Sequence, residues 1–230
     1  MMTMKKNHKS SNKTKVIEAI AADNIQTIDV VSDIPKIPDE YNLFFDMDGV
    51  LMLYDEDFYK PVDKDNRPTI HAPINKFGAH IFLKTKPCET MVEAVQTLHE
   101  LSADAKINVH ILSGVNPTIV MTEHVLDKFI AINDILPDLD RNNIHIAPSG
   151  LKVDYITKFL HRPINVKDIL IDDYPKNLRQ WQQYNGTAIK AINDFNVNHG
   201  DFDYIDTRDE SNVIIDKLFQ IITNIHERED

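Results

Sequence analysis

Short hydrophobic runs alternate with amphipathic stretches along most of this chain. A run of three to six apolar residues is typical of a strand in a sheet that is buried on both faces. Between the runs, apolar residues recur every three or four positions, as on one face of a helix. The expected strands cover 41–45, 107–112, 144–147, 169–171 and 187–192, and the expected helices cover 90–101, 117–130, 152–160, 175–185 and 212–225. This alternation predicts an α/β fold, a doubly wound, Rossmann-like parallel sheet.

Local side-chain patterns predict where two of these helices begin. Thr90 and Glu93 have the spacing of a capping box, which opens a helix. Asn116 followed by Pro117 has the pattern of an N-cap and a first helical residue. The apolar residues expected on the helix after Pro117 are Ile119, Val120, Leu126, Phe129 and Ile130.

The chain divides into three parts by composition. Residues 1–40 are expected to form an N-terminal extension, partly disordered because its first residues are rich in Lys, Asn, Ser and Thr. Residues 41–51 and 87–230 are expected to form the α/β core. Residues 52–86 have little helical periodicity and follow the first strand directly, so we expect them to form a small cap over the carboxyl edge of the sheet. Aromatic residues of this cap, such as Tyr54 and Phe58, suit either stacking on a substrate or a small core of the cap itself.

The charge of the chain excludes some classes of partner. It has 25 basic and 36 acidic residues, a net charge of −11, which disfavours broad binding of nucleic acid or of an anionic membrane. No apolar stretch approaches the roughly 20 residues that span a bilayer, and the start of the chain lacks a secretory pattern. A single cysteine, Cys88, rules out an intramolecular disulfide and a thiolate zinc cluster. We therefore expect a cytoplasmic protein.

Aspartate pairs must be interpreted with care in this chain. Aspartate accounts for 26 of its 36 acidic residues, so Asp-x-Asp pairs arise by chance, and five of them occur. Four are expected to be loop acids. The fifth, Asp46 and Asp48, follows a buried strand directly and precedes Gly49, whose freedom at positive φ suits a tight turn. Context therefore selects this pair. The four others are Asp55/Asp57, Asp63/Asp65, Asp138/Asp140 and Asp201/Asp203.

Polar residues follow several of the expected strands at the point where each strand ends. Ser113 follows the second strand, and Asp172 and Asp173 end the fourth. Lys152 opens the helix after the third strand. Because ligands bind outside the carboxyl ends of parallel strands, we expect these groups to meet Asp46 and Asp48 at one edge of the sheet.

Such a group of carboxylates requires a cation. A single pair of like charges about 4 Å apart costs on the order of 4 kcal/mol at an effective dielectric constant near 20. Hard oxygen ligands without His or Cys favour Mg²⁺, which also binds phosphate oxygens. The sequence therefore predicts a Mg²⁺ site that attracts a small phosphorylated substrate. The expected metal ligands are Asp46, Asp48, Asp172 and Asp173.

Each group at this edge has a chemistry to which it is suited. Asp46, at the strand tip, can attack phosphorus, and Asp48 can protonate the leaving oxygen and later deprotonate water. Ser113 can hydrogen-bond phosphoryl oxygens, while Lys152 can neutralise the nucleophile and the transferring group. Lys167 is the alternative to Lys152, but it lies five residues before Asp172, at the opposite end of that strand.

The same positions resemble the motifs of the haloacid dehalogenase-like (HAD) superfamily of phosphohydrolases. Residues 44–51 (Phe-Phe-Asp-Met-Asp-Gly-Val-Leu) are similar to its first motif, 111–114 (Ile-Leu-Ser-Gly) to its second, and 169–173 (Ile-Leu-Ile-Asp-Asp) to its fourth. Lys152 stands in a position suited to the third. The resemblance implies a Mg²⁺-dependent phosphomonoesterase with an aspartyl-phosphate intermediate, and the acid at Asp48 is the mark of phosphatases rather than dehalogenases. Residues 170–177 are similar to the 5′-nucleotidase and deoxyribonucleotidase-like branch, which has a small cap after the first motif.

The resulting hypothesis is a phosphatase for a small phosphomonoester, preferably a nucleoside monophosphate. Two alternatives remain open at this point. One is a phosphatase for a sugar phosphate or a nucleic-acid 3′ end, although no basic groove is expected outside the N-terminal extension. The other is a non-catalytic regulator that binds a phosphorylated ligand on the same fold.

Overall fold

A six-stranded parallel sheet forms the centre of the protein. The computed structural model describes residues 39–54, 78, 80–118 and 120–229, so the predicted N-terminal extension and most of the predicted cap lie outside the described residues. In the sheet the strands follow the order β5-β4-β1-β6-β7-β8, and all five strand pairs are parallel. This confirms the predicted doubly wound sheet. The strands are β1 (Tyr41–Phe45), β4 (Ile107–Val115), β5 (Ile144–Pro148), β6 (Asp168–Asp172), β7 (Thr187–Ile192) and β8 (Asp203–Asp206).

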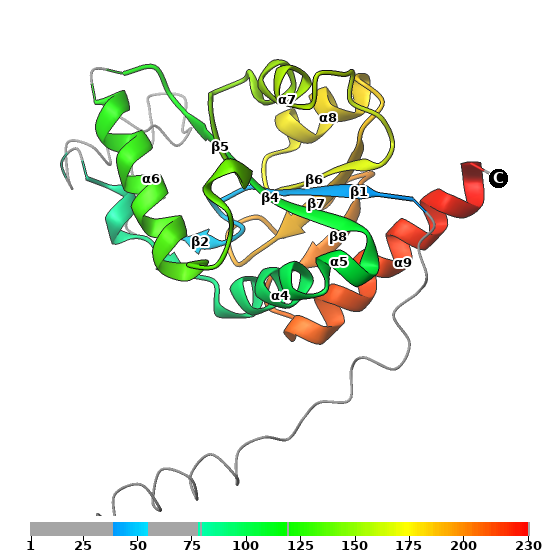
Figure 1. Cartoon of the computed structure of the whole chain (residues 1–230). Coiled ribbons are helices and arrows are strands. Elements are labelled where there is room, and N and C mark those ends of the chain that lie inside the picture. Colours follow the sequence, from blue (N-terminus) through cyan, green and yellow to red (C-terminus); the bar gives the residue numbers. More distant parts are fainter. Residues whose placement is uncertain (1–38, 55–77, 79, 119, 230) are drawn as a thin grey trace, which may run out of the picture. The chain divides into compact units, whose positions relative to one another are not determined.

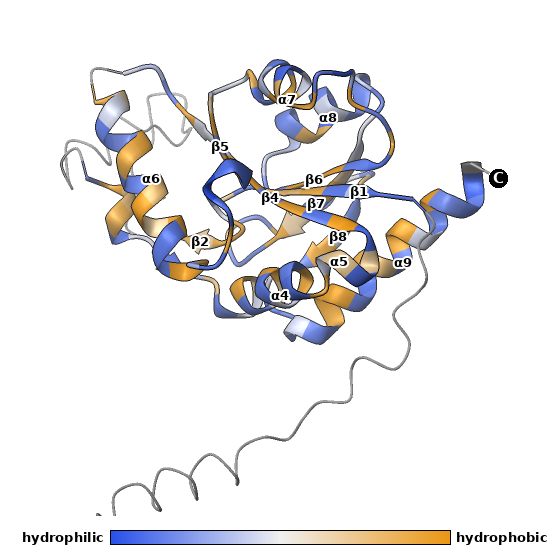
Figure 2. Ribbon diagram, in the orientation of Figure 1, coloured by the Kyte–Doolittle hydropathy of each residue, from blue (hydrophilic) through white to orange (hydrophobic). Residues whose placement is uncertain are grey.

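Helices cover both faces of the sheet. In Figure 1, α7 and α8 lie on one face, and α4, α5 and α9 lie on the other. The middle of the sheet is hydrophobic, whereas the helices carry hydrophobic and hydrophilic residues in turn (Figure 2). None of the helices in the described ranges has both the length and the hydropathy needed to cross a membrane. The helices are α4 (Glu89–Glu100), α5 (Ser102–Ala105), α6 (Met121–Ile135), α7 (Lys152–Leu160), α8 (Pro175–Gln183) and α9 (Ser211–Glu229), with short 3-10 turns η2 (Phe82–Lys84) and η3 (Arg141–Asn143).

The core under α7 and α8 is built around one aromatic pair. Trp181 of α8 is fully buried and packs edge-on against Phe44 of β1, with ring centroids 5.4 Å apart. Its indole Nε1 donates a hydrogen bond to the carbonyl of Asp168 at 2.9 Å, so the tryptophan has a packing role. Gly186 is required beside it, because a Cβ there would lie 2.3 Å from the indole ring.

Neither predicted helix start is found. Helix α4 begins at Glu89, and the Thr90 hydroxyl donates to the carbonyl of Thr207 at 2.6 Å instead of capping the helix. After Asn116, the amide of Thr118 donates to the carbonyl of Asn116 in a tight turn, and α6 begins only at Met121. A tertiary contact therefore replaces the first pattern, and a local turn replaces the second.

Helix α6 also buries a different face from the one expected. Leu126 and Ile130 are exposed by 56% and 40%, whereas polar side chains of the helix point inward. The inward polar residues are His124, Asp127 and Lys128. The consequence of this orientation for the site is described below.

The edge strand β8 was not predicted, and Asp203 therefore lies on a strand and not in a loop. Of its four residues only Ile205 is buried, so the segment lacks the hydrophobic run of a central strand. An edge strand with one hydrophobic contact has little to distinguish it from a loop in sequence.

A two-stranded ladder joins the ends of the predicted cap segment. Met52–Leu53 (β2) pairs antiparallel with Lys86–Pro87 (β3), in the register Met52 to Pro87 and Leu53 to Lys86. The chain therefore leaves and returns at neighbouring points. Residues 55–77 and 79 lie outside the described ranges, so the cap stays a prediction.

Candidate active site

The candidate site lies where the direction of sheet construction reverses. Counting only the strands of the large sheet in chain order, their spatial order is 3-2-1-4-5-6, so the reversal falls between β1 and β6. The amide of Asp46 donates to the carbonyl of Ile171 at 2.8 Å, which sets Asp46 beside the end of β6. The strand pairing thus places residues 126 positions apart in sequence side by side at the carboxyl edge.

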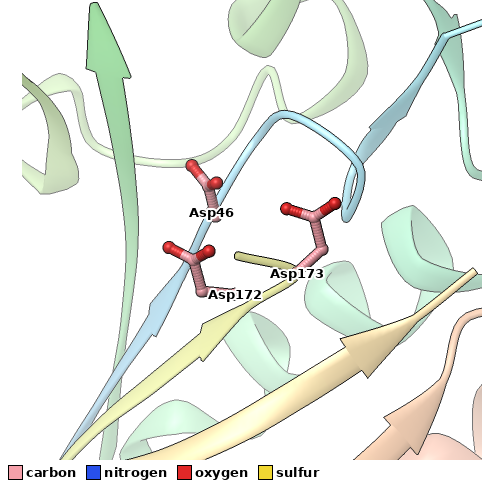
Figure 3. A group of neighbouring side chains, drawn as sticks. All are labelled: Asp46, Asp172 and Asp173. Atoms are coloured by element: carbon pink, nitrogen blue, oxygen red, sulfur yellow. The ribbon is translucent and has the colours of Figure 1, made fainter. Parts of the chain in front are cut away.

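Three carboxylates meet at this point. One oxygen from each of Asp46, Asp172 and Asp173 lies within 4.8 Å of the others, which is close enough for all three to hold one metal ion. Figure 3 shows the three side chains gathered at the ends of β1 and β6. Asp172 is fully buried and Asp46 is nearly so. The juxtaposition of Asp46 and Asp172, on which the sequence hypothesis depended, is therefore present.

Gly49 allows the third carboxylate to come this close. Its φ is +77°, in the region that favours glycine, and a Cβ at this position would lie 2.4 Å from Oδ2 of Asp173. The carbonyl of Gly49 also accepts a hydrogen bond of 2.8 Å from Asn193 Nδ2, which fixes the turn after β1. Any larger side chain at residue 49 would displace Asp173.

Lys152 bridges two of the carboxylates. Its Nζ lies 3.0 Å from Oδ1 of Asp46 and 2.6 Å from Oδ2 of Asp172. Burial alone would lower the pKa of this ammonium, but the charges of Asp172 and Asp46 outweigh it and raise the pKa overall. The alternative, Lys167, pairs with Asp39 at 2.9 Å and lies by the start of β1, at the opposite end of the sheet.

Burial and like charge disfavour the ionised forms of two of these carboxyl groups. Burial is the largest cause that raises the pKa of Asp46 to about 7; Lys152 opposes it, and Asp172 adds to it. Burial, followed by the charges of Asp172 and Asp46, raises the pKa of Asp173 to about 8. Both groups therefore ionise less readily than an aspartate in solvent, and a bound cation would favour their charged forms.

Asp48 lies apart from this cluster, next to Ser113. Its Oδ2 accepts a hydrogen bond from Lys128 and lies 3.5 Å from the Ser113 hydroxyl. The three carboxylates able to share an ion do not include the side chain of Asp48, so its predicted role as a metal ligand gains no support from side-chain geometry. Its position suits the proton-transfer role better.

Three residues near the site were not assigned roles from the sequence. Lys128 reaches Asp48 from α6, Asn177 Nδ2 donates to Oδ2 of Asp172 at 2.8 Å, and Lys190 donates to the carbonyl of Asp173. Lys190 interrupts the apolar run of β7, and a lysine in a buried strand needs a partner, so the sequence offered a sign of it. Lys128 offered a weaker sign, because a lysine on an amphipathic helix is usually exposed to solvent.

Comparison with solved structures identifies the fold. No protein-family model matches the sequence, and no curated protein matches it. The crystal structure of a HAD hydrolase of family IA, variant 3, from Entamoeba histolytica superposes with a TM-score of 0.52 at 12% identity, over 80% of this chain and 100% of that one. The chain has the HAD hydrolase fold. A second HAD-type structure, D,D-heptose 1,7-bisphosphate phosphatase from B. bronchiseptica in complex with magnesium and phosphate, matches at 12% identity with a TM-score of 0.48, over 78% of this chain and 98% of that one.

The HAD fold confirms the architecture that the sequence resemblance implied. At 12% identity the likeness concerns the arrangement of strands and helices and not the substrate. The geometry of Asp46, Asp172 and Lys152 is accordingly the basis for assigning a reaction.

Proposed function

We propose that this protein is a Mg²⁺-dependent phosphatase that hydrolyses a small phosphomonoester through an aspartyl-phosphate on Asp46. The observation that carries the proposal is the cluster of three carboxylates at the reversal point of the sheet, bridged by Lys152. It combines a metal-binding donor set with a nucleophile and a fixed positive charge.

The donor set fits a magnesium ion. All three groups are carboxylates, the hard oxygen ligands that Mg²⁺ prefers, and they come within 4.8 Å of one another. Burial and, after it, the neighbouring carboxylates raise the pKa of Asp46 and Asp173, and a divalent cation would favour their charged forms. When bound, Mg²⁺ supplies charge neutralisation of phosphoryl oxygens.

The side chain of Asp46 is prepared for attack. Its Oδ1 accepts hydrogen bonds from the amide of Met47 at 2.8 Å and lies 3.0 Å from Lys152 Nζ. Its Oδ2 has no hydrogen bond within the described part of the chain. In the first step Oδ2 attacks phosphorus, the bond from phosphorus to the leaving oxygen breaks, and Asp48 gives that oxygen a proton.

The second step reverses the role of Asp48. A water molecule attacks the phosphorus of the aspartyl-phosphate, Asp48 takes the water's proton, and the bond from phosphorus to Asp46 breaks to release inorganic phosphate. Lys152 neutralises Asp46 as it is freed, and Ser113 is placed to hydrogen-bond a phosphoryl oxygen. Atoms and charges balance over the cycle.

The preferred substrate is a (deoxy)nucleoside monophosphate. The support is the resemblance of residues 170–177 to the nucleotidase-like branch, which extends from β6 into α8 and includes Asn177 beside Asp172. A panel of deoxynucleotides, ribonucleotides and sugar phosphates, assayed with Mg²⁺, tests this choice. A clear preference for sugar phosphates would contradict it without contradicting the phosphatase chemistry.

Substitution of the nucleophile tests the chemistry itself. Asp46→Asn should lower kcat for p-nitrophenyl phosphate by about 10⁴-fold or more, because the amide cannot form the covalent intermediate. The variant should remain folded by circular dichroism. Asp138→Asn is the matched control: this exposed acid belongs to another Asp-x-Asp pair, and its loss should leave kcat unchanged. An Asp46→Asn enzyme with substantial activity would refute the assignment.

A further inference from the structure

Lys128, a buried lysine on α6, contacts Asp48, the proposed acid–base residue, which lies apart from the carboxylate cluster of Asp46, Asp172 and Asp173. Lys128 is fully buried, and its Nζ donates hydrogen bonds to Oδ2 of Asp48 and, at 2.8 Å, to the hydroxyl of Ser113. Lys152, by contrast, contacts Asp46 and Asp172. Lys128 and Lys152 therefore have separate partners in the site.

The segment before α4 closes over this lysine. The ring of Phe82, in η2, lies 4.1 Å from Nζ of Lys128, an arrangement in which the ring face attracts the cation. Phe82 also packs edge-on against His124, and His80 Nδ1 lies 2.9 Å from Oδ1 of Asp127. The Phe82 ring covers the ammonium group of Lys128, and the contacts with His124 and Asp127 hold the segment before α4 against α6.

Such an arrangement needs a reason, because an ammonium group is costly to bury unless it is paired. The only carboxylate within ion-pair distance of Lys128 in the described part of the chain is Asp48. Helix α6 thus presents its polar face inward, with Leu126 left exposed, and in doing so delivers one positive charge to Asp48.

The two oxygens of Asp48 are in unlike surroundings. Oδ2 is held by Lys128 and faces Ser113, whereas Oδ1 is buried and has no hydrogen-bond partner among the described residues. The contact with Lys128 is therefore the main side-chain constraint on the orientation of this carboxylate.

We propose that Lys128 is a positioning residue that holds Oδ2 of Asp48 and so orients this carboxyl group to protonate the leaving oxygen and later to accept the proton of water. This inference rests on the proposed function and deepens it. It assigns Lys128 a role in proton transfer and not in metal or phosphate binding, which remains with the cluster around Asp46.

Leaving groups of different basicity separate these roles. An alkyl phosphate such as glycerol 2-phosphate needs a proton on its leaving oxygen, whereas p-nitrophenolate leaves readily without one. In Lys128→Met, kcat/KM for the alkyl phosphate should fall by about 10- to 100-fold, and that for p-nitrophenyl phosphate by less than about 3-fold. The matched control Lys158→Met, an exposed lysine on α7, should change neither value. Equal losses on both substrates would overturn the proposal.

A second set of variants shows whether Lys128 acts through Asp48. In an Asp48→Asn background, Lys128→Met should change kcat/KM for glycerol 2-phosphate by less than about 2-fold, because the group it positions is gone. Independent, multiplying effects would overturn the proposal. Should Lys128→Met fail to fold, Lys128→Arg serves in its place: it keeps the charge but shifts the donor, and should give the same unequal loss on the two substrates at smaller size.

The failure of this inference can be told apart from failure of the proposed function. A wild-type protein that hydrolyses no phosphomonoester with Mg²⁺ present would refute the proposed function. The contact would then be tested by thermal unfolding of the same four proteins: wild type, the two single variants and the double variant. Additive changes in melting temperature would overturn the positioning role, and non-additive changes would support it.

Discussion

Strand β6 begins and ends with a fully buried aspartate, and the two ends differ in how their charge is balanced. At its start, Asp168 accepts two hydrogen bonds from the Arg162 guanidinium, at 2.6 and 2.8 Å. It accepts two more from Asn42 Nδ2 at 2.8 Å and from the amide of Asn165 at 2.9 Å. One carboxylate thus has one guanidinium and two neutral donors, and the charges cancel.

At the other end of β6, Asp172 is just as well bonded. It accepts from Lys152 at 2.6 Å, from Asn177 at 2.8 Å and from the amide of Tyr174 at 2.7 Å. Yet one carboxylate oxygen each of Asp46 and Asp173 lies within 4.8 Å of an oxygen of Asp172. Burial and like charge raise the pKa of Asp46 and of Asp173. Burial and hydrogen bonding do not separate the two aspartates. The two further carboxylates beside Asp172 do, and they mark the end of the strand at which we place the proposed site.

Substituting each aspartate in turn should give opposite phenotypes. Asp172→Asn should lower kcat by about 10³-fold, because a proposed metal ligand is lost, while the metal-free protein keeps its stability since one of several like charges is removed. Asp168→Asn should lower the free energy of unfolding by about 1–3 kcal/mol, because the buried donors around it lose a charged acceptor while Arg162 remains partly exposed to solvent, and kcat of the folded fraction should change little. Steady-state kinetics and urea unfolding measure the two effects.

Each of the two variants is the control for the other, since both replace an aspartate by asparagine on β6. If Asp168→Asn abolished turnover at full stability, or if Asp172→Asn unfolded the protein at full activity, the contrast between the two ends would be wrong.

Magnesium should stabilise the protein in a manner that depends on pH. A carboxyl whose pKa is higher in the folded state than its unfolded value of 3.8 destabilises the fold as pH rises, up to about 7 for Asp46 and about 8 for Asp173. Mg²⁺ at 100 times its Kd adds about 2.7 kcal/mol, and protons compete with it at low pH. The increase in melting temperature should therefore be larger at pH 8 than at pH 5.5. It should persist in Asp168→Asn and disappear in Asp172→Asn, and an equal increase in both would count against the site.

A histidine pair should produce the smallest effect, in the acid range. His110 and His145 lie with their ring nitrogens 3.3 Å apart, and burial lowers the pKa of each to about 4, with the charge of His145 as a further cause at His110. The unfolded chain binds protons at these histidines near pH 6.5, whereas the folded chain binds them only near pH 4. The contribution of the pair to stability should therefore fall as pH drops through this window, opposite in sign to that of Asp46 and Asp173. The loss should be about 1 kcal/mol per histidine after allowance for solvent screening.

His145→Phe should remove about half of this acid-range loss, because one of the two histidines is gone. A phenylalanine suits this place because Phe159 already packs against the His145 ring, with centroids 4.3 Å apart. Urea unfolding at pH 7 and pH 4.5 measures it. An unchanged pH dependence in the variant would show that the pair does not titrate as described. The loss of stability with rising pH that Asp46 and Asp173 cause should be the same in the variant as in the wild type.

The sheet and the carboxylate cluster could be predicted because their determinants are local. Each central strand is a hydrophobic run that ends in a polar residue, and parallel pairing brings such ends together without further information. Asp46, Asp172 and Lys152 were found in this way, and the structure places them within hydrogen-bond or ion-binding distance.

A helix in the region of α6 was predicted, but its buried face could not be, because its orientation is determined by distant partners. Its apolar residues Leu126 and Ile130 suggested one buried face, but the ion pair of Lys128 with Asp48 turns another face inward. The two partners are 80 residues apart, and no periodicity encodes that pairing. The same holds for Thr90, whose hydroxyl bonds a carbonyl 117 residues away instead of capping its own helix.

The position of Trp181 gives this protein an intrinsic optical probe. It is the single tryptophan of the chain, and its indole donates to the carbonyl of Asp168, at the charge-balanced end of β6. Its fluorescence will therefore follow the integrity of the structural end of the strand and be insensitive to small rearrangements around Asp172. Emission and catalysis can thus be read separately in one sample, with loss of turnover at constant emission pointing to the site and a joint loss to the scaffold.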